Sequence, residues 1–215
     1  MNEKNINIYD KELREEFVKK GQVLYVRGLA SGSAGNMSAM QSDGKIIVTP
    51  TGCCLGDLRY DELSTVDLNG KLIDGPKPTK EAKFHAAIMK NNPDIKAIVH
   101  LHSTFATALS CLNNLDPEDV IKPFTPYVVM KMGRIKLIPY FKPGSENLVT
   151  ALAHNASGNK AWLLANHGLV TGGKNLTEAV NNAEELEATA KLFFFLRSCK
   201  DHIRYLTKDE VTELL

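Results

Sequence analysis

The chain has 215 residues, of which 43% are hydrophobic and 24% charged, an ordinary balance that suffices for one globular domain with a real core. A formal net charge of +1 excludes the strongly basic surface of a nucleic-acid-binding protein and a long acidic tail. No apolar run approaches the ~20 residues of a membrane helix. We therefore expect neither a nucleic-acid nor a membrane partner.

The N-terminal segment and the cysteines indicate a cytoplasmic protein. The segment MNEKNINIYDKELREEF is polar and acidic, and it lacks the apolar stretch of a signal peptide. The cysteines show neither the spacing of a zinc finger nor that of a disulfide framework; they are Cys53, Cys54, Cys111 and Cys199. We expect reduced thiols and a cytoplasmic location.

Apolar periodicity and turn residues predict a series of short strands and several helices. In chain order, we expect a helix over 10–28, strands over 37–40, 45–49, 64–68 and 71–73, a helix from 80 to about 91, a buried strand over 97–102, a helix over 103–111, strands over 135–139, 161–164 and 168–171, and a long helix over 176–198. Thr79 suits the N-cap of the second helix, and Ser42-Asp43-Gly44 a hairpin turn. These elements indicate one α/β domain over residues 1–215, with helices packed on a mixed sheet.

The tripeptide His100-Leu101-His102 is the first sign of a metal site. On a strand, residues i and i+2 face the same side, so both imidazoles project together while Leu101 points into a core. Two adjacent neutral imidazoles suit zinc. The alternative is a hydrogen-bonded surface pair at the end of a strand.

Two further segments offer additional metal ligands, although a histidine before glycine is also typical of a capped turn. Asn166-His167-Gly168 joins two strands where glycine allows close backbone approach, and Glu81 lies near the positive end of a helix. Three histidines and a glutamate would hold a catalytic zinc that stays open to substrate. His85 shares a helix face with Glu81, and spacing alone does not separate His85 from His167 as a ligand.

The other histidines and a run of carboxylates indicate solvated surface. His154 and His202 lie in polar helical or terminal segments. Glu184, Glu185 and Glu187 are most simply an exposed helix face.

A separate set of residues suits a phosphate. The loop Ser31–Asn36 offers successive backbone N–H groups, hydroxyls and an amide, which can form a concave nest for an anion. It matches neither the P-loop nor the dinucleotide pattern, and a plain turn is the alternative. Thr51-Gly52 and Thr79-Lys80 supply similar groups, and Lys80 adds a positive charge beside the expected metal ligand.

Together the motifs resemble the class II aldolase/adducin family of sugar-phosphate lyases and epimerases. The resemblance runs from about residue 10 to 210 and rests on five blocks: Gly32-Ser33-Ala34-Gly35-Asn36, Thr49-Pro50-Thr51-Gly52, Lys77-Pro78-Thr79-Lys80-Glu81, His100-Leu101-His102-Ser103 and Asn166-His167-Gly168. It implies a single-domain, three-layer α/β fold in which a central mixed or antiparallel sheet carries helices on both sides.

The resemblance also implies roles for the site residues. One Zn2+ ion per subunit would be held by Glu81, His100, His102 and His167, which excludes His85, and Glu81 would also act as the acid/base. Substrate and phosphate binding would involve Ser33, Gly35, Asn36, Thr51, Gly52, Thr79 and Lys80. Tyr140 aligns with a tyrosine that reaches a neighbouring active site in family members. It is either a second proton donor or a strand-end aromatic, and a homotetramer is implied.

A narrower resemblance is to one branch of the family, the 3-oxo-tetronate 4-phosphate decarboxylases. These enzymes form dihydroxyacetone phosphate and CO2 from a four-carbon keto acid phosphate. The similar segments are residues 50–56, 99–104, 122–130, 183–187 and 203–207. Lys80 stands where most aldolases of the family carry serine, which weakens a fuculose-phosphate aldolase assignment.

The expected function is therefore zinc-dependent decarboxylation of a small phosphorylated sugar acid through a metal-stabilised enediolate. Aldol cleavage passes through the same enediolate. The alternatives are thus cleavage of a ketose 1-phosphate of the fuculose or rhamnulose type and 4-epimerisation of a pentulose 5-phosphate. From a different class, the fold also occurs as a non-enzymatic interaction module, which would not need all four metal ligands.

Overall fold

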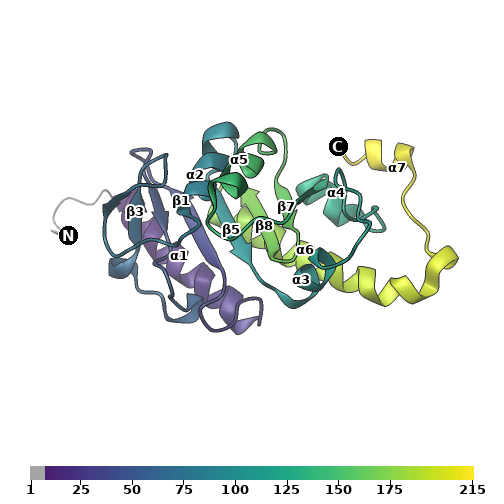
Figure 1. The fold of residues 1–215 in the computed structure, drawn as a ribbon, viewed down its shortest axis with the longest axis horizontal. Coiled ribbons are helices and arrows are strands. Elements are labelled where there is room, and N and C mark those ends of the chain that lie inside the picture. Colours follow the sequence, from purple (N-terminus) through teal and green to yellow (C-terminus); the bar gives the residue numbers. More distant parts are fainter. Residues whose placement is uncertain (1–7) are drawn as a thin grey trace.

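The computed structural model describes residues 8–215, built around one eight-stranded sheet (Figure 1). The first seven residues, part of the expected domain and of the segment examined for a signal peptide, lie outside the described residues. The strands are β1 (Asn36–Met40), β2 (Ile46–Val48), β3 (Ser64–Val66), β4 (Leu72–Asp74), β5 (Ala97–Leu101), β6 (Ile135–Ile138), β7 (Ala161–Leu164) and β8 (Gly168–Gly173). The helices are α1 (Ile8–Val26), α2 (Ala82–Asn91), α3 (Thr104–Ser110), α4 (Pro126–Met132), α5 (Glu146–His154), α6 (Leu176–Leu196) and α7 (Lys208–Thr212), with 3-10 turns η2 (Leu55–Asp57), η3 (Tyr60–Glu62) and η4 (Arg197–His202).

The strands lie in the order β4-β3-β2-β1-β5-β8-β7-β6. Every neighbouring pair is antiparallel except β6 and β7, which run parallel. The expected mixed sheet is thereby confirmed. The first hairpin closes at the predicted turn, where Gly44 has a φ of 81° that a side chain would strain.

Helices cover both faces of the sheet, which confirms the three-layer fold (Figure 1). α1, α3, α4 and α6 contribute apolar side chains to one buried cluster, whereas α2 and α5 contribute to a second. On β5, Val99 and Leu101 belong to the first cluster and Ile98 to the second, because successive side chains of a strand point to opposite faces. Both faces of β5 are therefore packed, and His100 is fully buried.

The start of α2 corrects the sequence prediction, because Thr79 is not its N-cap. The N-cap is Glu81, with φ −99° and ψ 0°, and the helix begins at Ala82. Thr79 is held in the extended conformation instead: its N–H donates to the carbonyl of Thr49, and Pro78 forms a bridge with Pro50. This isolated β-bridge extends the pairing of the chain beyond the named strands, and the helix begins two residues later than predicted.

Other helix boundaries also differ from the prediction. The sequence patterns do not predict α4, α5 or α7, of which α4 and α7 have only seven and five residues. The long helix ends at Leu196 and continues as η4, not as α-helix to residue 198. Among the helices of residues 8–215, none combines the length and the apolar character needed to cross a membrane.

Candidate metal centre and substrate cavity

Three histidines converge at one end of the central strands. His100 lies on β5, His102 just beyond its end, and His167 in the turn between β7 and β8. One ring nitrogen from each lies within 4.8 Å of the others, and the Nε2 atoms of His100 and His102 are 3.1 Å apart. The two residues of the His-X-His pair therefore do meet, although His102 is outside the strand. His100 is buried, whereas His102 is exposed.

Two glycines allow this convergence. A Cβ on Gly168 would lie 2.3 Å from the carbonyl oxygen of Leu101, so only glycine lets the β7–β8 turn approach β5 this closely. A Cβ on Gly35 would lie 3.0 Å from the carbonyl oxygen of His100 on the other side. The backbone of the His-X-His segment thus packs closely against two glycines, Gly35 and Gly168.

Glu81 adds a carboxylate to the cluster. Its Oε2 lies 3.3 Å from His100 Nε2, and its Oε1 lies 3.7 Å from His167 Nε2. Oε1 is buried without a hydrogen-bond partner in the protein. A buried carboxylate oxygen left unsatisfied is costly, and a cation is the partner that would satisfy it. Three imidazoles and one carboxylate are a donor set that fits a divalent metal.

Desolvation of the rings keeps the imidazoles of His102 and His167 neutral, although His102 taken as a whole residue is exposed. Burial first, and then the neighbouring His100, lower the pKa of His102 and of His167 to about 4. Burial opposes ionisation of Glu81, yet His100 and a hydrogen bond from Asn36 shift its pKa below the ordinary value. At neutral pH the cluster therefore offers free nitrogen lone pairs and a charged carboxylate, the protonation states in which these groups bind metal.

His85 lies beside the cluster but takes no part in it. Its ring is fully buried, with Nδ1 2.7 Å from Ser38 Oγ and Nε2 2.7 Å from Asn36 Oδ1. Both nitrogens are therefore occupied. Of the two histidines that spacing left open, the fold brings His167 to His100 and His102.

A cavity of about 380 Å³ opens beside the histidines. Glu81, His102 and His167 line part of its wall. The structure also brings to this wall all the residues expected to bind substrate or phosphate: Ser33, Gly35, Asn36, Thr51, Gly52, Thr79 and Lys80. Cys53 and Pro143 line it as well and had no distinguishing signal in the sequence.

Tyr140 is not among the residues that line this cavity. It follows β6 and is 62% exposed. Within this chain, its side chain is thus available to solvent or to another molecule.

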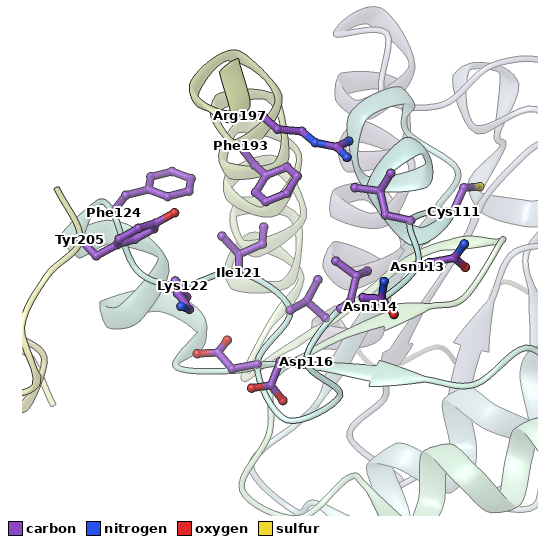
Figure 2. A pocket seen from close by; sticks show the side chains of 14 residues that line it. Cys111, Asn113, Asn114, Asp116, Ile121, Lys122, Phe124, Phe193, Arg197 and Tyr205 are labelled. Carbon is purple, nitrogen blue, oxygen red and sulfur yellow. The ribbon is translucent and has the colours of Figure 1, made fainter. Parts of the chain in front are cut away.

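A larger cavity, of about 660 Å³, lies elsewhere, between the loop after α3 and the end of α6 (Figure 2). Its lining includes Lys122, Phe193, Arg197 and Tyr205. None of the expected site residues lies in its wall. The chemistry therefore points to the smaller cavity.

Glu187 corrects the prediction of an exposed carboxylate face on α6. It is 9% exposed, and its carboxylate accepts hydrogen bonds from Ser103 Oγ and from the backbone N–H groups of Phe105 and Ala106. Sequence reasoning missed this residue because one inward position on an acidic stretch of helix has no local signature.

Comparison with known proteins identifies the family. The model of the Class II Aldolase and Adducin N-terminal domain matches residues 15–194. This chain belongs to the class II aldolase and adducin family. The resemblance expected from the five motif blocks is thereby confirmed.

Members of the class II aldolase and adducin family that cover almost the whole chain refine this result. The chain is 55% identical over 205 residues to the 3-oxo-tetronate 4-phosphate decarboxylase of Pectobacterium atrosepticum, covering 95% of this chain and 93% of that protein. It is 53% identical over 201 residues to the protein of the same name from Haemophilus influenzae, covering 94% and 95%. The crystal structure of YgbL from Klebsiella pneumoniae matches with a TM-score of 0.93 and 53% identity, covering 97% of this chain and 100% of that one. The expected branch of the family is thus confirmed.

Proposed function

We propose that this chain is a decarboxylase that converts 3-oxo-tetronate 4-phosphate to dihydroxyacetone phosphate and CO2. The observation that carries the proposal is the cavity in which Glu81, His102 and His167 lie beside the Ser33–Asn36 loop and Thr51. Such a wall combines metal ligands with hydrogen-bond donors, as a substrate with both a keto group and a phosphate requires. Identity above 50% to two decarboxylases of this name supports the same reaction.

The metal we propose is one zinc ion per subunit, held by Glu81, His100, His102 and His167. Three imidazoles are the protein ligands of one kind of catalytic zinc, and the unsatisfied Oε1 of Glu81 supports a cation at this point. When bound, zinc supplies a Lewis acid that draws electron density from the keto oxygen of the substrate.

The residues of the chain hold the substrate and move a proton. In this proposal the Ser33–Asn36 loop, Thr51-Gly52 and Thr79 bind the phosphate, and Lys80 pairs with the carboxylate. The C1–C2 bond breaks, CO2 departs, and the electron pair passes to C2 and the C3 oxygen. Glu81 delivers a proton to C2, which completes dihydroxyacetone phosphate, and then regains a proton from solvent, so that each turnover consumes one solvent proton.

We also propose that the enzyme is a cytoplasmic homotetramer of single-domain subunits. Tyr127 and Met130 on α4 and Tyr140 after β6 are each at least 60% exposed, which supports contacts with other subunits. In such an assembly Tyr140 reaches the cavity of a neighbour as a second proton donor. The free thiols of all four cysteines support a reducing compartment.

A substrate panel tests the reaction. Zinc-loaded protein is expected to release CO2 and dihydroxyacetone phosphate in equal amounts from 3-oxo-tetronate 4-phosphate. An aldolase would instead release an aldehyde together with dihydroxyacetone phosphate from a ketose 1-phosphate, and no CO2. Both products are measured by coupled enzyme assays on the same samples.

Two histidine variants provide the controls. His100→Ala removes a buried ligand and is expected to lose activity and bound zinc, whereas His154→Ala changes an exposed histidine on α5 and is expected to retain both. Release of CO2 no faster than that of His100→Ala contradicts the proposed reaction. Folded protein that binds no zinc would indicate an interaction module.

A further inference from the structure

A chain of four buried side chains lies behind the metal centre. Ser38 Oγ is 2.7 Å from His85 Nδ1, and His85 Nε2 is 2.7 Å from Asn36 Oδ1. Asn36 Nδ2 in turn lies 2.7 Å from Glu81 Oε2. Asn36 and Ser38 share one face of β1, and Glu81 and His85 lie one turn apart at the start of α2. The chain therefore ties the helix to the strand and ends on the carboxylate of the site.

Hydrogen-bonding chemistry fixes the direction of this chain. An ionised carboxylate only accepts, so Asn36 turns its NH2 group toward Glu81 and its oxygen toward His85. His85 Nε2 must then carry the proton, which leaves Nδ1 to accept from the hydroxyl of Ser38. One tautomer of a neutral ring satisfies all three bonds. Because the ring is fully buried, water does not compete with Asn36 and Ser38 for its two nitrogens.

We propose that His85 is a positioning residue that orients the Glu81 carboxylate through Asn36. The proposal rests on the proposed function of Glu81 as metal ligand and acid/base. The relay holds Oε2 at a point 3.3 Å from His100 Nε2, and this orientation places Oε1 3.7 Å from His167 Nε2, where it has no hydrogen-bond partner in the protein. A reversed Asn36 amide would place its oxygen against the carboxylate and repel it. In this proposal His85 orients a metal ligand without being a ligand itself.

Two substitutions of His85 separate the roles of its nitrogens. The amide of glutamine lies near the position of Nε2, so His85→Gln retains a donor to Asn36. The amide of asparagine lies near Nδ1, so His85→Asn retains only the bond to Ser38. We expect His85→Asn to bind zinc about 10–100-fold more weakly, the usual cost of losing a group that orients a ligand. His85→Gln is expected to bind nearly as tightly as the unmodified protein.

Chelator competition measures these affinities without any substrate, and circular dichroism of each variant establishes that it is folded. His154→Asn makes the same change in an exposed histidine and is expected to leave zinc affinity unchanged. In activity assays, His85→Asn is expected to lower kcat, because the Glu81 carboxylate loses the hydrogen-bond relay that orients it.

The tautomer provides a second readout, which needs no variant to fold. Two-bond 1H–15N NMR of the zinc-loaded protein is expected to show His85 protonated at Nε2. Protonation at Nδ1, or equal zinc affinities for folded His85→Asn and His85→Gln, would overturn the proposal. Absence of decarboxylation alongside the expected affinities would refute only the proposed reaction.

Discussion

Glu187 of α6 caps α3 through Ala106, whose backbone N–H donates to the Glu187 carboxylate over 2.8 Å. Phe105 N–H and the Ser103 hydroxyl donate to the same carboxylate. Ser103 is the N-cap of α3 but makes no side-chain capping bond of its own, so the positive end of α3 is compensated from another helix. These groups directly follow His102, and α6 thereby fixes the backbone at the edge of the metal centre.

Glu187→Gln is expected to lower the free energy of unfolding by about 1–3 kcal/mol, because the amide turns a donor toward groups that themselves donate. Urea denaturation measures the change. The matched control is Glu184→Gln, which loses only an ion pair with the half-exposed Arg27 and is expected to shift stability by less than about 1 kcal/mol. Equal losses in the two variants would contradict a capping role.

Gly168→Ala is expected to weaken zinc binding. A Cβ at this position would be 2.3 Å from the Leu101 carbonyl oxygen, so the turn that carries His167 has to move away from β5. Gly158→Ala is the control, because Gly158 has a φ of 70° but open space around its Cβ, and the variant carries backbone strain alone. Isothermal titration is expected to show lower zinc affinity only for Gly168→Ala.

The metal-free protein is expected to lose stability as the pH falls from about 6.5 toward 4. Burial is the main cause, followed by the neighbouring His100, that lowers the pKa of His85 to about 3 and the pKa values of His102 and His167 to about 4, from an ordinary 6.5. In that window the unfolded chain binds more protons than the folded one, so acid favours unfolding, and above it the effect is absent. Urea denaturation across the pH range measures the slope. A free energy of unfolding that stays constant between pH 7 and pH 5 would refute this.

Zinc is expected to stabilise the folded chain by mass action. At a free zinc concentration 100 times its Kd, the gain is about 2.7 kcal/mol, visible as a rise in the thermal midpoint. His102→Ala removes one of the three converging imidazoles and is expected to show a much smaller rise. The exposed His154 supplies the control His154→Ala, which is expected to respond like the unmodified protein. The same rise in all three proteins would place the zinc elsewhere.

Lys80→Met is expected to raise KM for the keto acid phosphate by about 10–100-fold, the usual cost of losing a hydrogen bond to a charged group. Lys80 is exposed at the cavity wall, and no ion pair within residues 8–215 involves it. Lys83→Met is the control, because Lys83 pairs with Glu146 on the surface. Steady-state kinetics distinguish the two variants, and an unchanged KM for Lys80→Met would exclude Lys80 from substrate binding.

Local periodicity was sufficient for much of the fold. All eight strands were predictable to within one or two residues, because alternation and turn residues act over a few positions. Helices α4 and α7 were not, since seven and five residues are too few to show a helical period. Thr79 was misassigned because its backbone pairs with Thr49, a contact between segments far apart in the sequence.

In the candidate site too, some features follow from local sequence and others only from contacts between distant segments. The sequence spacing of His100 and His102 predicts that they meet, and they do, although His102 lies one residue beyond the end of β5; the choice between His85 and His167 has no such local signal. His85 is turned toward β1, where Ser38 and Asn36 occupy its ring, and only the packing of α2 on the sheet determines this. The inward position of Glu187 likewise depends on how α6 lies against α3.

The packing of β5 on both faces bears on the kinetics of metal exchange. Because β5 is enclosed in this way, we expect it to open only with the rest of the molecule and its amide hydrogens to exchange with solvent on the timescale of complete unfolding. An ion bound at its end would therefore not be released by a local fluctuation of the strand. We expect such an ion to enter and leave through the cavity, whose wall includes His102 and Lys80.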